Sequence, residues 1–135
     1  MIETFVFDTN TLISAYILAN SKNTKAYNKA FDTGILVYSA ATFDEFAETF
    51  VRLKFEKYLP LDKRLSSIKE FRTRAVLINV EISFSACRDP KDNKFLELAV
   101  TANASCIITG DKDLLVLHPF RGIPILNAVD FINNF

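Results

Sequence analysis

Short apolar segments alternate with segments of helical spacing along the whole chain, and this alternation limits the fold more than any other feature. The apolar segments are rich in Val, Ile, Leu and Phe, and we expect them to be strands over residues 2–7, 35–38, 76–82, 106–109 and 124–126. Between them, apolar side chains recur three and four residues apart, which predicts helices over 12–17, 25–31, 42 to the proline at 60, 61–75, 89–99, 111–115 and 128–135. Buried strands separated by helices are typical of a doubly wound α/β fold, in which helices cover both faces of a mostly parallel sheet.

Length and composition favour one domain and exclude several kinds of site. The chain has 135 residues, of which 50% are hydrophobic and 24% charged, so residues 1–135 are expected to form a single domain with a sizeable core. The three glycines, Gly34, Gly110 and Gly122, are too scattered for a dinucleotide-binding turn or a P-loop. One histidine and two cysteines exclude a Cys/His zinc site unless carboxylates complete it.

The expected location is the cytoplasm. The two cysteines are well separated, which favours a reducing compartment over a disulfide framework. An acid, Glu3, stands where a secretory signal carries basic residues, and no apolar run approaches the length of a membrane span. We therefore expect a soluble protein with no membrane partner.

Acidic residues follow the expected strands at the points where ligands bind in such sheets. Asp8 follows the first strand, Asp111 and Asp113 follow the fourth, and Glu45 and Asp92 lie in helices after the second and third. Carboxylates gathered at one end of a sheet repel one another unless a cation lies between them. Mg²⁺ or Mn²⁺, which prefer oxygen ligands, are the expected occupants.

Helix capping is the alternative explanation for each acid taken singly. Asp8 could be an N-cap, Glu45 the partner of Thr42 in a capping box, Asp92 a first-turn acid and Asp111 a turn residue. Capping alone does not explain why all four junctions use acids, since Ser, Thr and Asn cap equally well.

Four sequence blocks, in order along the chain, carry a family resemblance. They are residues 5–11 (FVFDTNT), 44–45 with 51–55 (DE and VRLKF), 88–94 (RDPKDNK) and 108–115 (ITGDKDLL). Together they resemble the PIN-domain family, and they are most similar to bacterial PIN proteins classed as toxins of toxin–antitoxin pairs. The resemblance covers essentially the whole chain.

The resemblance implies a metal-dependent ribonuclease on a Rossmann-like, three-layer α/β sheet. The residues that it implies are the catalytic and metal-binding acids Asp8, Glu45, Asp92 and Asp111, with Asp113 as a metal ligand or supporting acid, and Asn10 and Thr109 as polar neighbours. Asp89, which precedes a proline, is expected to cap its helix rather than bind metal. The resemblance also implies an antitoxin protein as partner and a homodimer, either of which could occupy an apolar groove between the helices of residues 9–58.

Basic residues gather in one segment although the net charge of the chain is zero. Residues 52–74 contain eight basic side chains against three acidic ones. This excess indicates either an ordinary solvated helical face or a surface that binds RNA phosphates. The best candidates are Arg52 and Lys54, which we expect on the same helix as Glu45; Lys94 and Lys112 could contact phosphate or balance neighbouring acids.

Competing functions are weaker. A phospho-aspartyl hydrolase or a receiver domain needs a second acid near the first strand, where Asn10 stands, and His118 and Cys106 lack the surroundings of a nucleophile. The leading hypothesis is a Mg²⁺- or Mn²⁺-dependent endoribonuclease that cuts single-stranded RNA and is restrained by an antitoxin. The alternative is a non-catalytic PIN-like module that binds RNA or protein.

Overall fold

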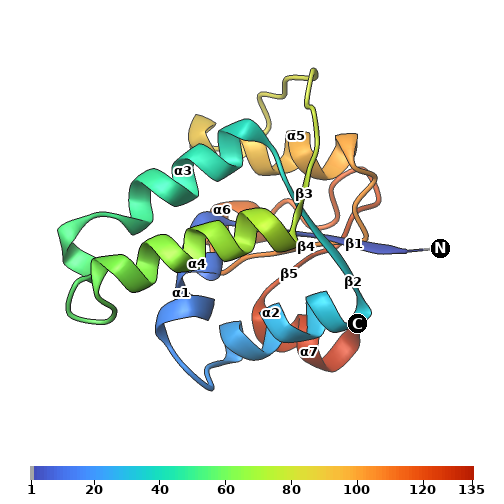
Figure 1. Cartoon of the computed structure of the whole chain (residues 1–135). Helices are drawn as coiled ribbons and strands as arrows, with labels where there is room; N and C mark the ends of the chain where they lie inside the picture. Colours follow the sequence, from blue (N-terminus) through green and yellow to red (C-terminus); the bar gives the residue numbers. More distant parts are fainter. Residues whose placement is uncertain (1) are drawn as a thin grey trace.

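The protein is described here by a computed structural model that covers residues 2–135 (Figure 1). Five parallel strands form one sheet in the order β3-β2-β1-β4-β5. Their bounds are β1 Glu3–Phe7, β2 Gly34–Tyr38, β3 Val76–Leu77, β4 Cys106–Ile108 and β5 Ile125–Leu126. The strand order reverses between β1 and β4, so the carboxyl ends of these two strands border the switch point, where ligands bind in such sheets.

Within residues 2–135, seven α-helices and two short 3₁₀ helices connect or follow the strands. The α-helices are α1 Thr9–Ile17, α2 Lys22–Thr33, α3 Ala40–Phe50, α4 Leu61–Arg74, α5 Asn93–Thr101, α6 Lys112–Leu115 and α7 Ala128–Asn134. The 3₁₀ helices are η1 Leu53–Phe55 and η2 Pro90–Asp92. Polar N-caps begin several of them: Ser21 caps α2, Ser39 caps α3 and Asn127 caps α7, each by accepting a backbone N–H three residues on.

Helices cover both faces of the sheet, so the predicted three-layer α/β architecture is confirmed. On one face, Phe5, Leu36 and Ile108 belong to a core that also contains side chains of α1, α2, α3, α4 and α7. On the other face, Val6 and Ile107 pack with α5 and α6. Figure 1 shows α2 and α7 side by side, and α3 next to α4.

The phenylalanines of the middle segment are mainly core residues. Phe46, Phe50 and Phe55 are buried, and the partly buried Phe43 packs against them. Phe46 stacks on Phe50 with ring centroids 5.6 Å apart, and Phe71 of α4 meets Phe46 edge to face at 5.5 Å. This aromatic cluster fixes α3 against α4.

Two expectations about the elements were wrong. The helix expected from residue 42 to the proline at 60 begins at Ala40 and ends at Phe50, because Ser39 caps it and the chain then turns into η1. The strand expected over 76–82 pairs with β2 only at Val76 and Leu77; the Ile78 N–H makes a last bond to the Tyr38 carbonyl oxygen at 2.8 Å, and residues 79–82 form no strand. The backbone amides of Phe84 and Cys87 are instead satisfied by side chains of α5, Glu97 and Asn93.

Gly34 permits a close approach of two strands. It pairs with Glu3 in the register of β1 and β2, and a Cβ atom at residue 34 would lie 2.2 Å from the Glu3 carbonyl oxygen. Its backbone is extended, with φ of −173°, so the requirement is for space and not for a left-handed conformation.

No helix among residues 2–135 is both long enough and apolar enough to cross a lipid bilayer.

Candidate active site

Asp8 lies at the carboxyl end of β1 and is almost fully buried, with 6% of its surface exposed. One carboxylate oxygen, Oδ1, accepts the backbone N–H of Thr11 at 3.0 Å, so Asp8 is the N-cap of α1. The other, Oδ2, accepts the hydroxyl of Thr109 at 2.6 Å. Burial raises the pKa of Asp8 although these hydrogen bonds oppose the rise. Asp8 therefore caps α1 through Oδ1 and contacts Thr109 through Oδ2, so its capping role does not exclude a second role at the end of the sheet.

Thr109 links the ends of the two strands at the switch point. Its hydroxyl donates to Asp8 and accepts the backbone N–H of Asp111 at 2.9 Å. Asp111 in turn accepts the backbone N–H of Asp113 at 2.9 Å and begins α6. The hydroxyl thus fixes Asp8 relative to the chain that carries Asp111, which is the supporting place expected for Thr109.

Asp92 completes a cluster of three acids. Burial first, and then the negative charges of Asp111, Asp89 and Asp8, raise the pKa of Asp92 to about 7. A cavity of about 350 Å³ brings the cluster together with basic side chains; it is lined by Asp8, Thr9, Asn10, Glu45, Thr49, Arg52, Lys54, Asp89, Lys91, Asp92, Phe95 and Asp111. Acids from four segments of the sequence therefore share one cavity, as expected.

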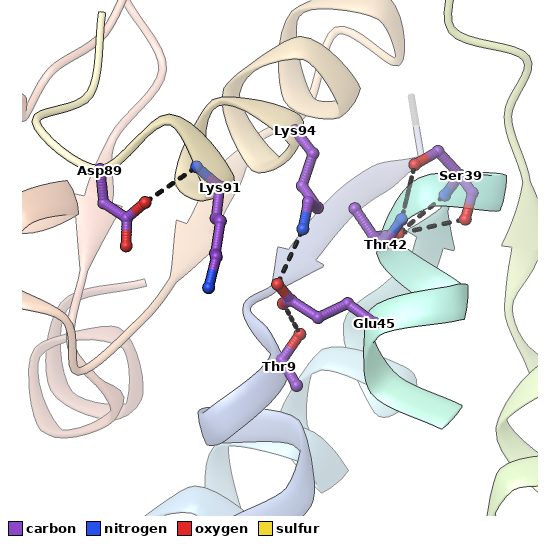
Figure 2. Close-up of polar contacts among 7 residues, drawn as sticks. All are labelled: Thr9, Ser39, Thr42, Glu45, Asp89, Lys91 and Lys94. Carbon is purple, nitrogen blue, oxygen red and sulfur yellow. Dashed lines mark hydrogen bonds and ion pairs between the residues drawn. The ribbon is translucent and has the colours of Figure 1, made fainter. Parts of the chain in front are cut away.

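Glu45 faces the same cavity but is engaged by a cation. Lys94 of α5 donates to Glu45 Oε1 at 2.7 Å, and the hydroxyl of Thr9 donates to Glu45 Oε2 (Figure 2). The capping box at the start of α3 is formed by Ser39 and Thr42 instead of Thr42 and Glu45, which rules out the capping explanation for Glu45. Lys94 accordingly balances an acid, one of the two roles left open for it.

Arg52 and Lys54 line the acidic cavity, although not by the expected route. They do not share a helix with Glu45, because α3 ends at Phe50; Arg52 lies in the turn that follows and Lys54 in η1. The buried Arg64 of α4 holds this connection by donating to backbone carbonyl oxygens. Arg64, although it belongs to the basic segment 52–74, therefore has a structural role, and its buried guanidinium is not accessible to RNA.

Four predicted residues do not line the cavity: Asp113, Lys112, Lys94 and Thr109. Of these, Lys94 and Thr109 contact Glu45 and Asp8, which do line it. One basic residue was missed: Lys91 lines the cavity one residue before Asp92, and its backbone N–H donates to Asp89 (Figure 2). Asp89 therefore caps η2 as expected, although its side chain also borders the cavity. The position of Lys91 between two acids of the RDPKDNK block was the available signal.

Other nucleophiles are poorly placed. Cys106 is fully buried in β4, and burial raises the pKa of its thiol to about 12. The exposed His118 uses Nδ1 to accept the backbone N–H of Ile125 at 2.8 Å. Neither residue lines the acidic cavity.

Across residues 2–135, no three Asp, Glu, His or Cys side chains converge closely enough to form a ready-made metal site. What the fold provides is a shared cavity with oxygen donors from Asp8, Asp92 and Asp111, in which their charges oppose one another.

Comparisons with known proteins agree with this architecture. The uncharacterized protein MJ1680 of the archaeon Methanocaldococcus jannaschii is 39% identical over 115 residues, which are 84% of this chain and 74% of that protein. The fold is similar to that of a chain in the crystal structure of VapBC2 from Rickettsia felis, which is bound to a DNA fragment from the VapBC2 promoter. The TM-score is 0.63, the identity is 13%, and the match covers 92% of this chain and 98% of that one. It is also similar to the protein PAE2754 of Pyrobaculum aerophilum, with a TM-score of 0.61, 11% identity and coverage of 97% and 90%.

The expected bacterial affiliation is not supported, because the curated relative is archaeal. The family itself is shown: residues 4–113 match the family described as PIN domain, and that range carries every acid of the cavity. The chain belongs to the PIN domain family.

Proposed function

We propose that this protein is a metal-dependent endoribonuclease that hydrolyses phosphodiester bonds in RNA. The observation that carries the proposal is the cavity in which Asp8, Asp92 and Asp111 face basic side chains. Membership of a family whose members are generally nucleases supports it. A cavity of mixed charge suits a reaction that needs both a cation site and a grip on phosphate.

The side chains fit Mg²⁺ or Mn²⁺ by their chemistry. Asp8, Asp92 and Asp111 offer only carboxylate oxygens, the ligands that these hard cations prefer. Burial and then the negative charges of neighbouring acids raise the pKa of Asp92, and a cation in the cavity would offset those charges. Glu45 would join the site after exchanging Lys94 for the ion, and Asp113 would support Asp111 from outside the cavity. A bound divalent ion lowers the pKa of a coordinated water and offsets charge on the phosphate.

The protein's own residues would bind and orient the substrate. Arg52, Lys54 and Lys91 line the cavity and would contact the phosphates on either side of the bond to be cut. Lys94, once released from Glu45, would become a further phosphate contact. Thr109 keeps Asp8 in place, and Asn10, exposed at the cavity, offers an amide that can hold water or a ribose hydroxyl.

We further propose that the protein is the toxin of a toxin–antitoxin pair in the cytoplasm. The similarity to the VapBC2 structure supports an antitoxin partner. Large apolar side chains are exposed near the end of α3 and the start of α4, where a partner or a second copy of the chain could cover them: Val51, Leu53, Tyr58, Leu61 and Leu65.

Incubation of the purified protein with mixed RNA, with Mn²⁺ or with EDTA, tests the nuclease. We expect cleavage only with Mn²⁺, and its loss in Asp8→Asn, which keeps a side chain able to cap α1. Asp44→Asn is the matched control, because Asp44 is an exposed acid next to Glu45 that does not line the cavity. Cleavage that persists in EDTA or in Asp8→Asn would refute the proposal. Metal-dependent binding without cleavage would favour the non-catalytic module.

A further inference from the structure

A row of three cavities runs along the carboxyl edge of the sheet. The acidic cavity shares Asp8, Asn10 and Asp111 with a second cavity of about 300 Å³. The second cavity shares Asn23 and Gly110 with a third, of about 740 Å³, between the start of α2 and the start of α7. Because neighbours in the row share wall residues, the three cavities adjoin one another along the protein surface from the acids to the third cavity.

Whereas the first cavity contains several acids beside basic side chains, the third contains basic side chains without acids, and most of the surface that faces it is apolar. Its walls are Asn20, Ser21, Lys22, Asn23, Lys25, Gly110, Asn127, Ala128 and Val129, with no acid among them. Both lysines are exposed and can reach phosphate oxygens. The amides of Asn20 and Asn23 offer donors and acceptors to base edges, and Asn127, whose Oδ1 caps α7, offers its NH₂ group. The volume lies within the range of cavities that hold small organic ligands.

Gly110 forms the passage between the second and third cavities. A Cβ atom built on it meets no other atom within 4 Å, so the passage is open above this residue. A longer side chain at this position would narrow the passage without a clash at its Cβ. The residue that permits passage can therefore be changed without repacking the core.

We propose that the third cavity binds nucleotides of a single-stranded RNA that lie beyond the bond to be cut, with Lys22 and Lys25 on the phosphates and the asparagine amides on the bases. The inference rests on the proposed nuclease function. A single strand is favoured because its base edges are free to meet the amides, whereas those of a duplex are paired. The binding site for RNA thereby extends from Arg52 and Lys54 at one end of the row to Lys25 at the other.

Fluorescence anisotropy with labelled hexauridylate and Mn²⁺, on the Asp8→Asn background that prevents cleavage, tests the lysines. We expect Lys22→Ala with Lys25→Ala to weaken binding about tenfold and to reduce the slope of log K against log salt by about 1.4, since each phosphate contact on a single strand contributes roughly 0.7. Lys63→Ala with Lys69→Ala is the matched control, because both are exposed lysines of α4 that line none of the three cavities.

Gly110→Leu tests the route. We expect it to weaken hexauridylate binding, with Gly110→Ala close to the parent. In the triple variant with Gly110→Leu, the two lysine substitutions should cause no further loss, because the strand no longer reaches them. Thermal unfolding followed by circular dichroism checks that each variant is folded.

Three results would overturn the inference: unchanged binding in the lysine variant, an equal loss in the α4 control, or losses that simply add in the triple variant. Each is distinct from failure of the proposed function, which is scored on the wild-type protein by cleavage with Mn²⁺. If the wild-type protein cuts RNA but the lysine variant binds RNA like its parent, the proposed subsite is refuted and the proposed nuclease function stands.

Discussion

Replacing Arg64 by Met should destabilise the protein strongly, although the residue lies in the most basic and outwardly exposed segment of the sequence. Its side chain is 1% exposed. Nη1 donates to the carbonyl oxygens of Phe50 at 2.8 Å and Arg52 at 3.1 Å, and Nε donates to that of Leu59 at 2.9 Å. Met keeps the apolar stem and removes only the guanidinium group.

The expected cost follows from these contacts. The hydrogen bond to Phe50 is fully buried and should contribute roughly 2–3 kcal/mol, and the two partly buried bonds about 1 kcal/mol each, because the carbonyls lose a charged donor. The ion pair with Glu56 adds under about 1 kcal/mol, since the acid is half exposed. Arg64→Met should therefore lower the free energy of unfolding by about 4–6 kcal/mol, a large part of the 5–15 kcal/mol typical of a domain.

Urea unfolding followed by circular dichroism measures this loss. Glu56→Gln removes only the ion pair and should cost under about 1 kcal/mol. Arg72→Met changes an exposed arginine of the same helix and should stay within about 0.5 kcal/mol of wild type. An Arg64→Met loss below about 1 kcal/mol, or one equal to that of Glu56→Gln, would refute the view that Arg64 is held by backbone carbonyls.

Three further predictions concern the sheet and the acids. Asp92→Asn should raise the melting temperature of the metal-free protein more at pH 8 than at pH 5. The reason is that the pKa of this carboxyl rises from 3.8 to about 7 on folding, so the wild-type folded state is destabilised as the pH increases between those values, and Asn removes this effect. An equal gain at both pH values, measured in EDTA, would contradict this. Gly34→Ala should destabilise the protein by several kcal/mol or prevent folding, because the new Cβ would overlap a backbone carbonyl of β1. Gly110→Ala should change the stability by under about 1 kcal/mol, because its Cβ would meet no other atom. Similar melting temperatures for the two variants would contradict this. Thr109→Val should reduce RNA cleavage by tenfold or more, with Thr109→Ser near wild type. Serine keeps the hydroxyl that donates to Asp8 and accepts the Asp111 N–H, and valine removes it. Equal rates in both variants would show that the hydroxyl is dispensable.

The strands and most helices were predictable because their causes are local. A short apolar run such as residues 106–108 has few alternatives to a buried strand, and α4 follows a proline that fixes its start. The end of α3 was not predictable in this way. The sequence from Val51 to Tyr58 keeps helical spacing, and the turn at η1 exists because Arg64, more than ten residues later, binds the carbonyls of the connection.

The membership of the acidic site followed from the sequence, since residues at the carboxyl ends of parallel strands meet at one edge of the sheet. This argument placed Asp8, Asp92 and Asp111 together and included Glu45. It also included Asp113, which lies in the first turn of α6 and does not line the cavity.

By itself, the sequence determined the layered α/β fold, the family and the edge of the sheet at which the acids gather, because these depend on local hydrophobic patterning and on the order of the blocks. Only the tertiary structure decided which charges are paired. Glu45 forms an ion pair with Lys94, which is 49 positions away in the sequence. The guanidinium of Arg64 donates to backbone carbonyls. Lys22 and Lys25 line the third of the three adjoining cavities, the first of which contains the acids. The physical reason is that a charge acts through distance and burial, and both are set when segments remote in sequence pack together.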